Sequence, residues 1–154
     1  MSDITSYRDL QCWQLAMDLA VLVYRVTRNY PADERYGLTF HTRKTAVSVP
    51  TNIAEGTRRP TPGYVARVTD ALAEHAELET QMMLGERLQY LSAAEMTAFM
   101  ELSGSVGRLS HGLLRSLEAL LPPEQSQPPS QNQFPSQNQS PSQSQSPRTK
   151  PRNP

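Results

Sequence analysis

The sequence predicts an all-α protein: an antiparallel up-down-up-down four-helix bundle with a kinked second helix, followed by a disordered C-terminal tail. Three observations support this fold class. Apolar residues recur with the 3.6-residue period of an α-helix in four segments. The connections between these segments are short, which favours antiparallel neighbours. No segment alternates apolar and polar residues with the period of a β-strand.

The chain divides near Pro122 into a bundle domain, residues 1–121, and a tail, residues 122–154, that is rich in Ser, Gln, Pro and Asn. The tail contains the near-repeat SQNQFP, SQNQSP and SQSQSP. Such a composition buries too little apolar surface to offset the entropy lost on ordering, so we expect the tail to be disordered. The tail either keeps the protein soluble or contributes weak electrostatic contacts between its basic residues and nucleic acid.

The first predicted helix, residues 9–29, carries two apolar stripes. The main stripe, which we expect to face the core, consists of Leu10, Trp13, Met17, Ala20, Val21 and Tyr24. The second stripe consists of Leu15, Leu19, Leu22 and Val26. Because the outer side of a surface helix is normally polar, a second stripe implies a second burial. We expect another copy of the chain to cover it as an oligomer interface. A kinked second helix or a folded-back terminus is the alternative cover.

The second predicted helix, residues 38–55, contains Pro50 in its interior. An interior proline removes a backbone hydrogen bond and costs roughly 3 kcal/mol. We therefore expect a kink whose cost is offset by tertiary packing. Ser48 and Asn52 flank the proline. Their side chains either satisfy the carbonyl group of Ala46, which lacks its usual donor, or form hydrogen bonds across a subunit interface.

Glu55 lies near the end of the second helix, where its negative charge opposes the helix dipole. It therefore requires a fixed positive partner, which is either Arg58 or an arginine of a neighbouring subunit.

Capping signals mark the starts of the remaining two helices. Thr61, followed by Pro62, is the predicted N-cap of the third helix. The segment from Ser92 to Glu95 is a capping box for the fourth helix.

Two charged residues fall on apolar sides of predicted helices: Arg43 on the second and Glu79 on the third. An unpaired buried ion costs several kcal/mol. We therefore predict an ion pair between Arg43 and Glu79 that fixes the register of the two helices, with His75 one turn from Glu79.

The candidate ligand-binding site is basic. It consists of Arg58 and Arg59, with Arg67 and Lys44 as further members. The arginines flank the start of the third helix, whose free amides also favour anions, so we expect contacts with nucleic acid phosphates. No aromatic ladder accompanies them in the sequence, which predicts little sequence preference. The alternative is a solvated loop without a ligand.

The chain contains 15 Lys and Arg residues and 15 Asp and Glu residues, but the signs are separated along the sequence. Basic residues dominate from 35 to 67, and acidic residues from 70 to 101. Either the two regions pair as adjacent helices, or the molecule is electrically polarised.

Several function classes are disfavoured. The single cysteine, Cys12, rules out an internal disulfide and fits a reducing compartment such as the cytoplasm. No stretch approaches the about 20 apolar residues of a membrane span, and no secretory signal is expected. No catalytic constellation occurs, and no histidine follows a glutamate at the three-residue spacing of di-iron bundles. We expect no metal, no cofactor and no enzymatic activity.

Three blocks of sequence resemble a known family. They are YRDLQCWQLAMDLA, YPADERYGLTFHTRKTAVSVPTNIAEGTRR and AELETQMMLGERLQYLS. Together they resemble the four-helix bundle proteins linked to intervening sequences of 23S rRNA genes, over about residues 7–121. The most specific element is SVPTNIAEG, residues 48–56. Thr42, Thr45 and His75 depart from the family pattern, which has apolar or small residues at those positions.

The resemblance implies a bundle that assembles into a ring-like pentamer and has no established enzymatic activity. It also implies kinship to accessory proteins of diversity-generating retroelements, which bind a reverse transcriptase and nucleic acid. We therefore predict a non-enzymatic homo-oligomer that binds RNA or DNA backbones through Arg58 and Arg59. The alternative is a protein scaffold that docks a partner through the acidic third helix or the second stripe of the first helix.

Overall fold

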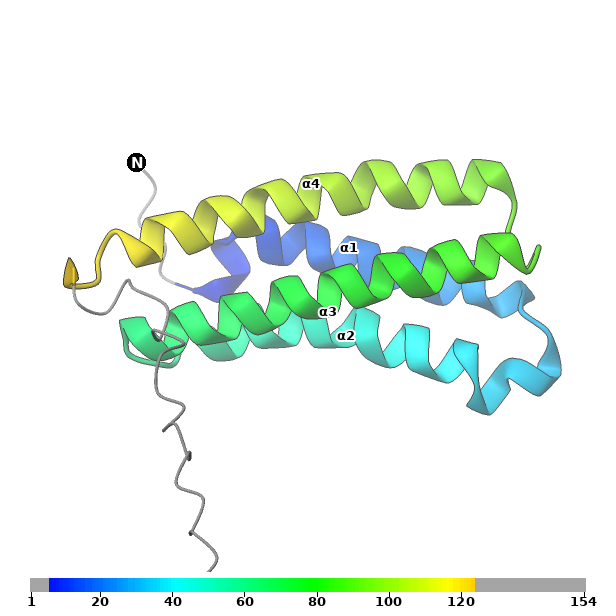
Figure 1. The fold of residues 1–154 in the computed structure, drawn as a ribbon, viewed down its shortest axis with the longest axis horizontal. Helices are drawn as coiled ribbons and strands as arrows, with labels where there is room; N and C mark the ends of the chain where they lie inside the picture. Colours follow the sequence, from blue (N-terminus) through cyan, green and yellow to red (C-terminus); the bar gives the residue numbers. More distant parts are fainter. Residues whose placement is uncertain (1–5, 124–154) are drawn as a thin grey trace, which may run out of the picture.

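The computed structural model describes residues 6–123, and within them the chain forms four α-helices (Figure 1). They are α1 (Gln11–Val26), α2 (Leu38–Gly56), α3 (Thr61–Arg87) and α4 (Ala93–Glu118), with short 3-10 turns η1 (Tyr7–Asp9), η2 (Thr27–Asn29) and η3 (Ala32–Tyr36). The chain direction reverses from each α-helix to the next, which fits the predicted up-down arrangement. The all-α fold class is confirmed. The predicted disordered tail lies almost entirely outside the described residues.

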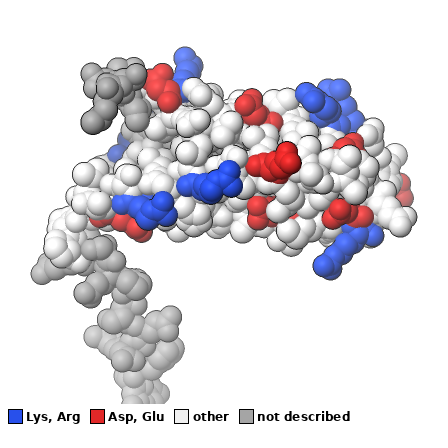
Figure 2. All heavy atoms as spheres, turned by 90° about the horizontal axis from the view of Figure 1, so that it is seen from above, with Lys and Arg blue, Asp and Glu red and all other residues white. Residues whose placement is uncertain are grey.

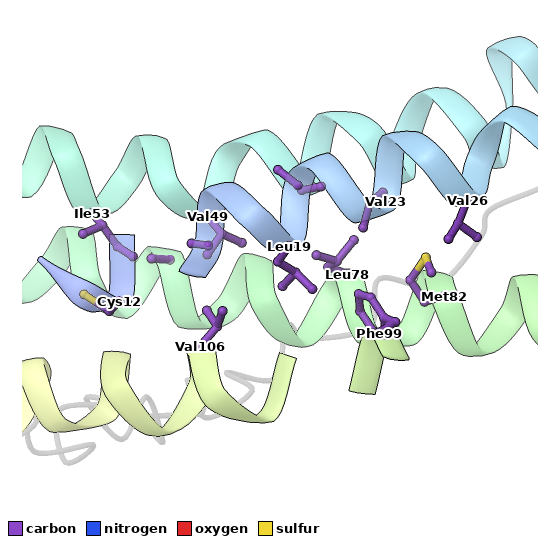
Figure 3. Close-up of a cluster of buried hydrophobic side chains, with 14 of the residues drawn as sticks. Cys12, Leu19, Val23, Val26, Val49, Ile53, Leu78, Met82, Phe99 and Val106 are labelled. Atoms are coloured by element: carbon purple, nitrogen blue, oxygen red, sulfur yellow. The ribbon is translucent and has the colours of Figure 1, made fainter. Parts of the chain in front are cut away.

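All four helices contribute apolar side chains to one core (Figure 3). The labelled side chains that meet there are Cys12, Leu19, Val23, Val26, Val49, Ile53, Leu78, Met82, Phe99 and Val106. Burying one large aliphatic or aromatic side chain contributes about 1.5–3 kcal/mol, so this shared core holds the helices together.

The assignment of the two α1 stripes was wrong in part. Leu10 and Ala20 of the main stripe are buried in the core as predicted, and Trp13 packs against it, but the second stripe is buried as well. Leu19 and Val26 are only 1% and 3% exposed and belong to the core (Figure 3), and Leu15 and Leu22 are half-buried against it. These four residues therefore do not form a free oligomer interface. The apolar residues that remain exposed on α1 are Met17, Val21 and Tyr24.

The reason lies in the small residues of α1. Cys12, Ala16 and Ala20 are buried next to Leu19 and Val23, and their short side chains let α1 approach its neighbours closely. Periodicity alone does not rank two apolar stripes on one helix.

Helix α2 runs through Pro50 as one helix, and Pro50 itself is buried. Within the described residues, neither Ser48 nor Asn52 forms a hydrogen bond with the carbonyl oxygen of Ala46, so that alternative was wrong. The Asn52 side-chain oxygen instead accepts a hydrogen bond from Arg67 Nη1 at 3.2 Å. The predicted kink, and a role of Ser48 in a subunit interface, stay predictions.

The predicted ion pair between Arg43 and Glu79 does not form. Arg43 Nε donates to the Thr27 hydroxyl at 2.8 Å, toward the end of α1. Glu79 faces α4, where its carboxylate accepts a hydrogen bond from Ser103 Oγ at 2.7 Å. The two side chains diverge because α2 packs against α1 as well as α3, and Arg43 is long enough to reach the α1 side. The predicted proximity of His75 to Glu79 is confirmed, with His75 Nε2 3.7 Å from the carboxylate.

The capping box of α4 is confirmed, but the cap of α3 differs from the prediction. Ser92 Oγ accepts a hydrogen bond from the Glu95 amide at 3.3 Å, and the Glu95 carboxylate accepts one from the Ser92 amide at 2.8 Å. At α3 the N-cap position is Pro60, and Thr61 is already helical. The helix therefore starts one residue earlier than predicted, because the fixed φ angles of Pro60 and Pro62 suit the first turn of a helix.

We expect Ser92→Ala to lower the free energy of unfolding by about 1 kcal/mol, because the variant loses the cap of α4. Hydrogen bonds from the Ser92 amide and hydroxyl lower the pKa of Glu95, so the variant should also raise that pKa toward its ordinary value. A lowered folded-state pKa stabilises at neutral pH, and this stabilisation is lost as the pH falls through that pKa.

Urea denaturation at neutral and acid pH, with an NMR titration of Glu95, measures both effects. The matched control is Ser116→Ala, which removes an exposed hydroxyl that donates to the Gly112 carbonyl at 3.0 Å. Equal losses of stability in the two variants would contradict the capping role.

Candidate nucleic-acid interface

Arg58 and Arg59 lie in the tight connection between α2 and α3. Their backbone is fixed by two hydrogen bonds, from the Arg58 amide to the Glu55 carbonyl at 3.1 Å and from the Arg59 amide to the Gly56 carbonyl at 2.9 Å. Both side chains are exposed and form no hydrogen bond or ion pair with the described residues. The connection therefore presents two guanidinium groups to solvent from a fixed backbone.

Two glycines determine how this connection sits on α3. A Cβ at Gly56 would collide with the ring of Tyr64, so the missing side chain lets Tyr64 pack directly on the end of α2. A Cβ at Gly63 would lie 3.1 Å from Arg59 Cβ, so the Arg59 side chain begins over the first turn of α3.

The start of α3 adds to the positive character of this region. Its N-cap residue is Pro60, which offers no side-chain hydrogen bond, and Pro62 has no amide hydrogen. The amides of Thr61 and Gly63 have no side-chain cap. Free amides and the helix dipole favour an anion here, beside the arginines.

Arg58 also lines a hollow of about 410 Å³ at this end of the bundle. Its walls are Ser6, Tyr7, Leu10, Thr57, Arg58, Tyr64, Leu113 and Leu117. Burial, and secondarily the nearby Cys12, raises the pKa of Tyr64 to about 12, so its hydroxyl stays protonated at neutral pH. The lining of the hollow combines apolar side chains with one positive charge, that of Arg58.

Arg67 differs from the other predicted members because its guanidinium is engaged within the molecule. Its Nε lies 3.6 Å from Glu55, and its Nη1 lies 3.4 Å from Asp70 and 3.2 Å from the Asn52 oxygen. The fixed partner of Glu55 is therefore Arg67, and the prediction of Arg58 in that role was wrong. Arg67 joins α2 to α3 and is less accessible to an external anion.

Lys44 lies apart from Arg58. They are 14 positions apart in the sequence, nearly all of them along α2, which at a helical rise of 1.5 Å per residue amounts to ~20 Å. Lys44 lies near Glu74 of α3. Burial and the charge of Glu77 raise the pKa of Glu74, and the positive charge of Lys44 lowers it in part. The predicted basic site therefore divides into two regions at different positions along α2.

The separation of charge along the sequence does not produce a surface of one sign on the face seen in Figure 2, where positive and negative side chains are interspersed. An electrostatic interaction between the two regions on adjacent helices is that of Lys44 on α2 with Glu74 on α3, which agrees with pairing. Arg67 also joins α3 to Glu55 of α2, whereas its contact with Asp70 lies within α3. Among residues 6–123, no cluster of three or more side chains could hold a metal ion. None of the helices in this range is both long and apolar enough to span a membrane.

We expect Gly56→Ala to destabilise the protein by about 1–3 kcal/mol, because the new methyl group displaces Tyr64. Gly112→Ala is the matched control, since a Cβ there meets nothing within 4 Å. It should stabilise α4 by roughly 0.5–1 kcal/mol through helix propensity. Thermal and urea denaturation of both variants measures the difference. If Gly56→Ala is as stable as Gly112→Ala, the close approach of Tyr64 is not a constraint.

We compared the chain with known proteins and protein families. No curated protein matched the chain. The family model described as 23S rRNA-intervening sequence protein matches residues 8–112, which include all of α1, α2 and α3 and most of α4. This is a non-catalytic family of small helical domains. The match spans more than half of the chain, and the chain therefore belongs to the 23S rRNA-intervening sequence protein family.

Proposed function

We propose that this protein is a non-enzymatic, homo-oligomeric, cytoplasmic protein that binds RNA backbones through Arg58 and Arg59. One observation carries the proposal: two exposed guanidinium groups, without hydrogen-bond or ion-pair partners among residues 6–123, lie beside the uncapped start of α3. The family's link to 23S rRNA genes supports RNA as the nucleic acid. DNA and a reverse transcriptase are the further partners that the resemblance to retroelement accessory proteins implies.

The geometry favours phosphate contacts over base reading. Arginine side chains and helix amides bind phosphate oxygens, and such contacts position a nucleic acid without reading its sequence. Binding through them releases counterions, so affinity falls steeply with salt. In a ring of copies the connection is repeated, which raises the overall affinity without new contacts.

We expect Arg58→Ala/Arg59→Ala to weaken binding to a mixed-sequence RNA duplex at low salt and to reduce the salt dependence. The slope of log K against log salt should fall by roughly 1 for each phosphate group that the variant no longer binds. Fluorescence anisotropy over a series of salt concentrations measures both quantities. Arg115→Ala, an exposed arginine near the end of α4, is the control. Unchanged affinity and slope in the double variant would contradict the proposed contact.

The support for self-assembly is a pair of unlike surfaces. The first is a groove of about 760 Å³ between α1 and α2, with Met17, Val21 and Val47 exposed along it. The second is a hollow of about 430 Å³ on α3 and α4, where Met100 is exposed. Exposed apolar patches of this kind mark interaction surfaces. A ring requires two different surfaces on each copy, because its contacts run head to tail.

The charges at the edges of these surfaces are complementary. Arg25 and Arg28 line the groove, and Glu86 and Glu101 line the hollow. The groove also contains Glu55, whose charge is paired with Arg67. We propose that the groove of one copy receives the α3–α4 surface of the next, with the two arginines of the groove opposed to the two glutamates of the hollow. Complementary charge fixes the register of such an interface.

We expect Met17→Glu/Val21→Glu to convert the oligomer into monomers, because two carboxylates would have to be buried in the apolar groove. Light scattering measures the mass. Both residues are exposed in the single chain, so the variant should keep its helical circular dichroism.

A charge exchange tests the pairing of the two surfaces. Arg25→Glu/Arg28→Glu and Glu86→Arg/Glu101→Arg should each weaken assembly, and the combination should restore it. A combination no better than either pair alone would show that these surfaces do not face each other.

The alternative function is a scaffold for a different protein, and the same apolar groove is the observation that favours it. A scaffold would bind its partner with little dependence on salt and would not require RNA. A monomeric wild-type chain with no RNA affinity would favour the scaffold.

A further inference from the structure

A second basic region lies where α1, η3 and the start of α2 meet. It is a hollow of about 340 Å³. Its lining is Tyr24, Arg35, Tyr36, Thr39, Phe40, Arg43 and Lys44. Three of these residues are cations, three are aromatic, and none carries a carboxylate. We refer to it as the aromatic hollow.

The aromatic rings of this hollow are unusually exposed. Tyr36 is 80% exposed and Phe40 53%, and Tyr24 is also exposed. By contrast, Tyr30 is buried and contacts the ring of Tyr90. Exposed rings grouped in one place indicate a binding surface rather than a part of the core.

Both arginines of the hollow lie over aromatic rings in cation–π contacts. The Arg43 guanidinium lies 5.0 Å from the centre of the Tyr24 ring, and its Nε is held by Thr27 Oγ1 at 2.8 Å. The Arg35 guanidinium lies 5.7 Å from the centre of the Tyr36 ring. Arg43 in particular is therefore fixed before any ligand binds, and its terminal nitrogens make no hydrogen bond to the described residues.

Aromatic rings interleaved with cations are the features that bind single-stranded nucleic acid. Unpaired bases stack on the rings, and the cations contact the phosphates. In a duplex the base faces are covered by neighbouring base pairs, so a stacking site selects unpaired bases. Because the lining contains no carboxylate, it favours binding of a polyanion over binding of a protein surface that carries charges of both signs.

We propose that the aromatic hollow binds unpaired bases of single-stranded RNA. Tyr36 and Phe40 are the stacking surfaces, and Arg35, Arg43 and Lys44 contact the phosphates. This inference rests on the proposed function, because both take RNA as the ligand. It adds a second site and a preference for single strands that the connection after α2 does not supply.

The test uses the full chain and a short single-stranded RNA that contains 2-aminopurine, whose fluorescence is quenched when it stacks. The wild type should bind and quench the probe. Tyr36→Ala/Phe40→Ala should abolish the quenching and weaken single-strand binding about tenfold or more, since stacking contributes about 1–3 kcal/mol per base. Affinity for a duplex of the same sequence should not change.

Three controls make the outcome specific. Tyr36→Trp keeps a stacking surface and should keep the quenching. Leu120→Ala removes an equally exposed apolar side chain from elsewhere and should have no effect. Arg58→Ala/Arg59→Ala should weaken duplex and single-strand binding alike and leave the quenching of the bound probe intact.

The two proposals fail in distinguishable ways. Duplex binding that depends on Arg58 and Arg59, without quenching of the single-stranded probe, overturns the aromatic hollow and leaves the proposed function in place. A wild type that binds neither RNA overturns both. If Tyr36→Ala/Phe40→Ala lowers the oligomer mass instead of single-strand affinity, the hollow is a protein contact and the proposal is wrong.

Discussion

The close approach of Tyr64 to the backbone of Gly56 is the constraint on which the rest of the α2–α3 pair depends. A side chain at Gly56 would push the start of α3 away from the end of α2. With the two helices in contact, Arg67 reaches Glu55 and Asn52, and the short connection presents Arg58 and Arg59 outward. The same packing that closes the bundle therefore positions the proposed phosphate contacts.

Farther along α3 the bundle contains a buried polar cluster. Ser103 Oγ donates to Glu79 and lies 2.7 Å from His75 Nε2, which is also 3.1 Å from the Ser103 carbonyl oxygen. Gly107 makes room for the imidazole, because a Cβ there would lie 3.2 Å from His75 Cε1. Buried polar groups are costly unless they are bonded, so this cluster fixes one register of α3 against α4. Thr42 and Thr45 of α2 are also buried. Thr45 donates a hydrogen bond to Glu77 at 3.1 Å, whereas the Thr42 hydroxyl has no partner in the described chain.

The sequence was sufficient for features that depend on local rules. The four helices follow from periodicity, and the cap at Ser92 follows from a four-residue pattern. Features that depend on which face turns inward were not predictable. Helix α1 is apolar on both sides, so only its buried alanines reveal that Leu19 faces the core. Arg43 lies on the predicted apolar side of α2, but its flexible side chain bonds to Thr27 of η2 rather than to α3.

The candidate site shows the same division. Arg58 and Arg59 are adjacent in the sequence, and their exposure in a connection was predictable. The aromatic hollow was missed because Tyr24 comes from α1, whereas Arg35 and Phe40 come from η3 and α2. The spacing of Tyr36 and Phe40, four residues apart among basic residues, was the one signal that the sequence offered. It was not interpretable while Tyr24 was assigned to the core.

Tyr24 links the two proposed interactions physically, because it lines both the groove and the aromatic hollow. A neighbouring copy seated in the groove would cover the side of Tyr24 that faces Val21 and Val47. The Arg43 guanidinium, held by Thr27, would keep the ring in place at the edge of that contact. Assembly would then order one wall of the hollow and reduce the entropy cost of stacking a base there. Self-assembly and RNA binding should therefore favour each other, and each copy in a ring would offer one single-strand site at the border of a subunit contact.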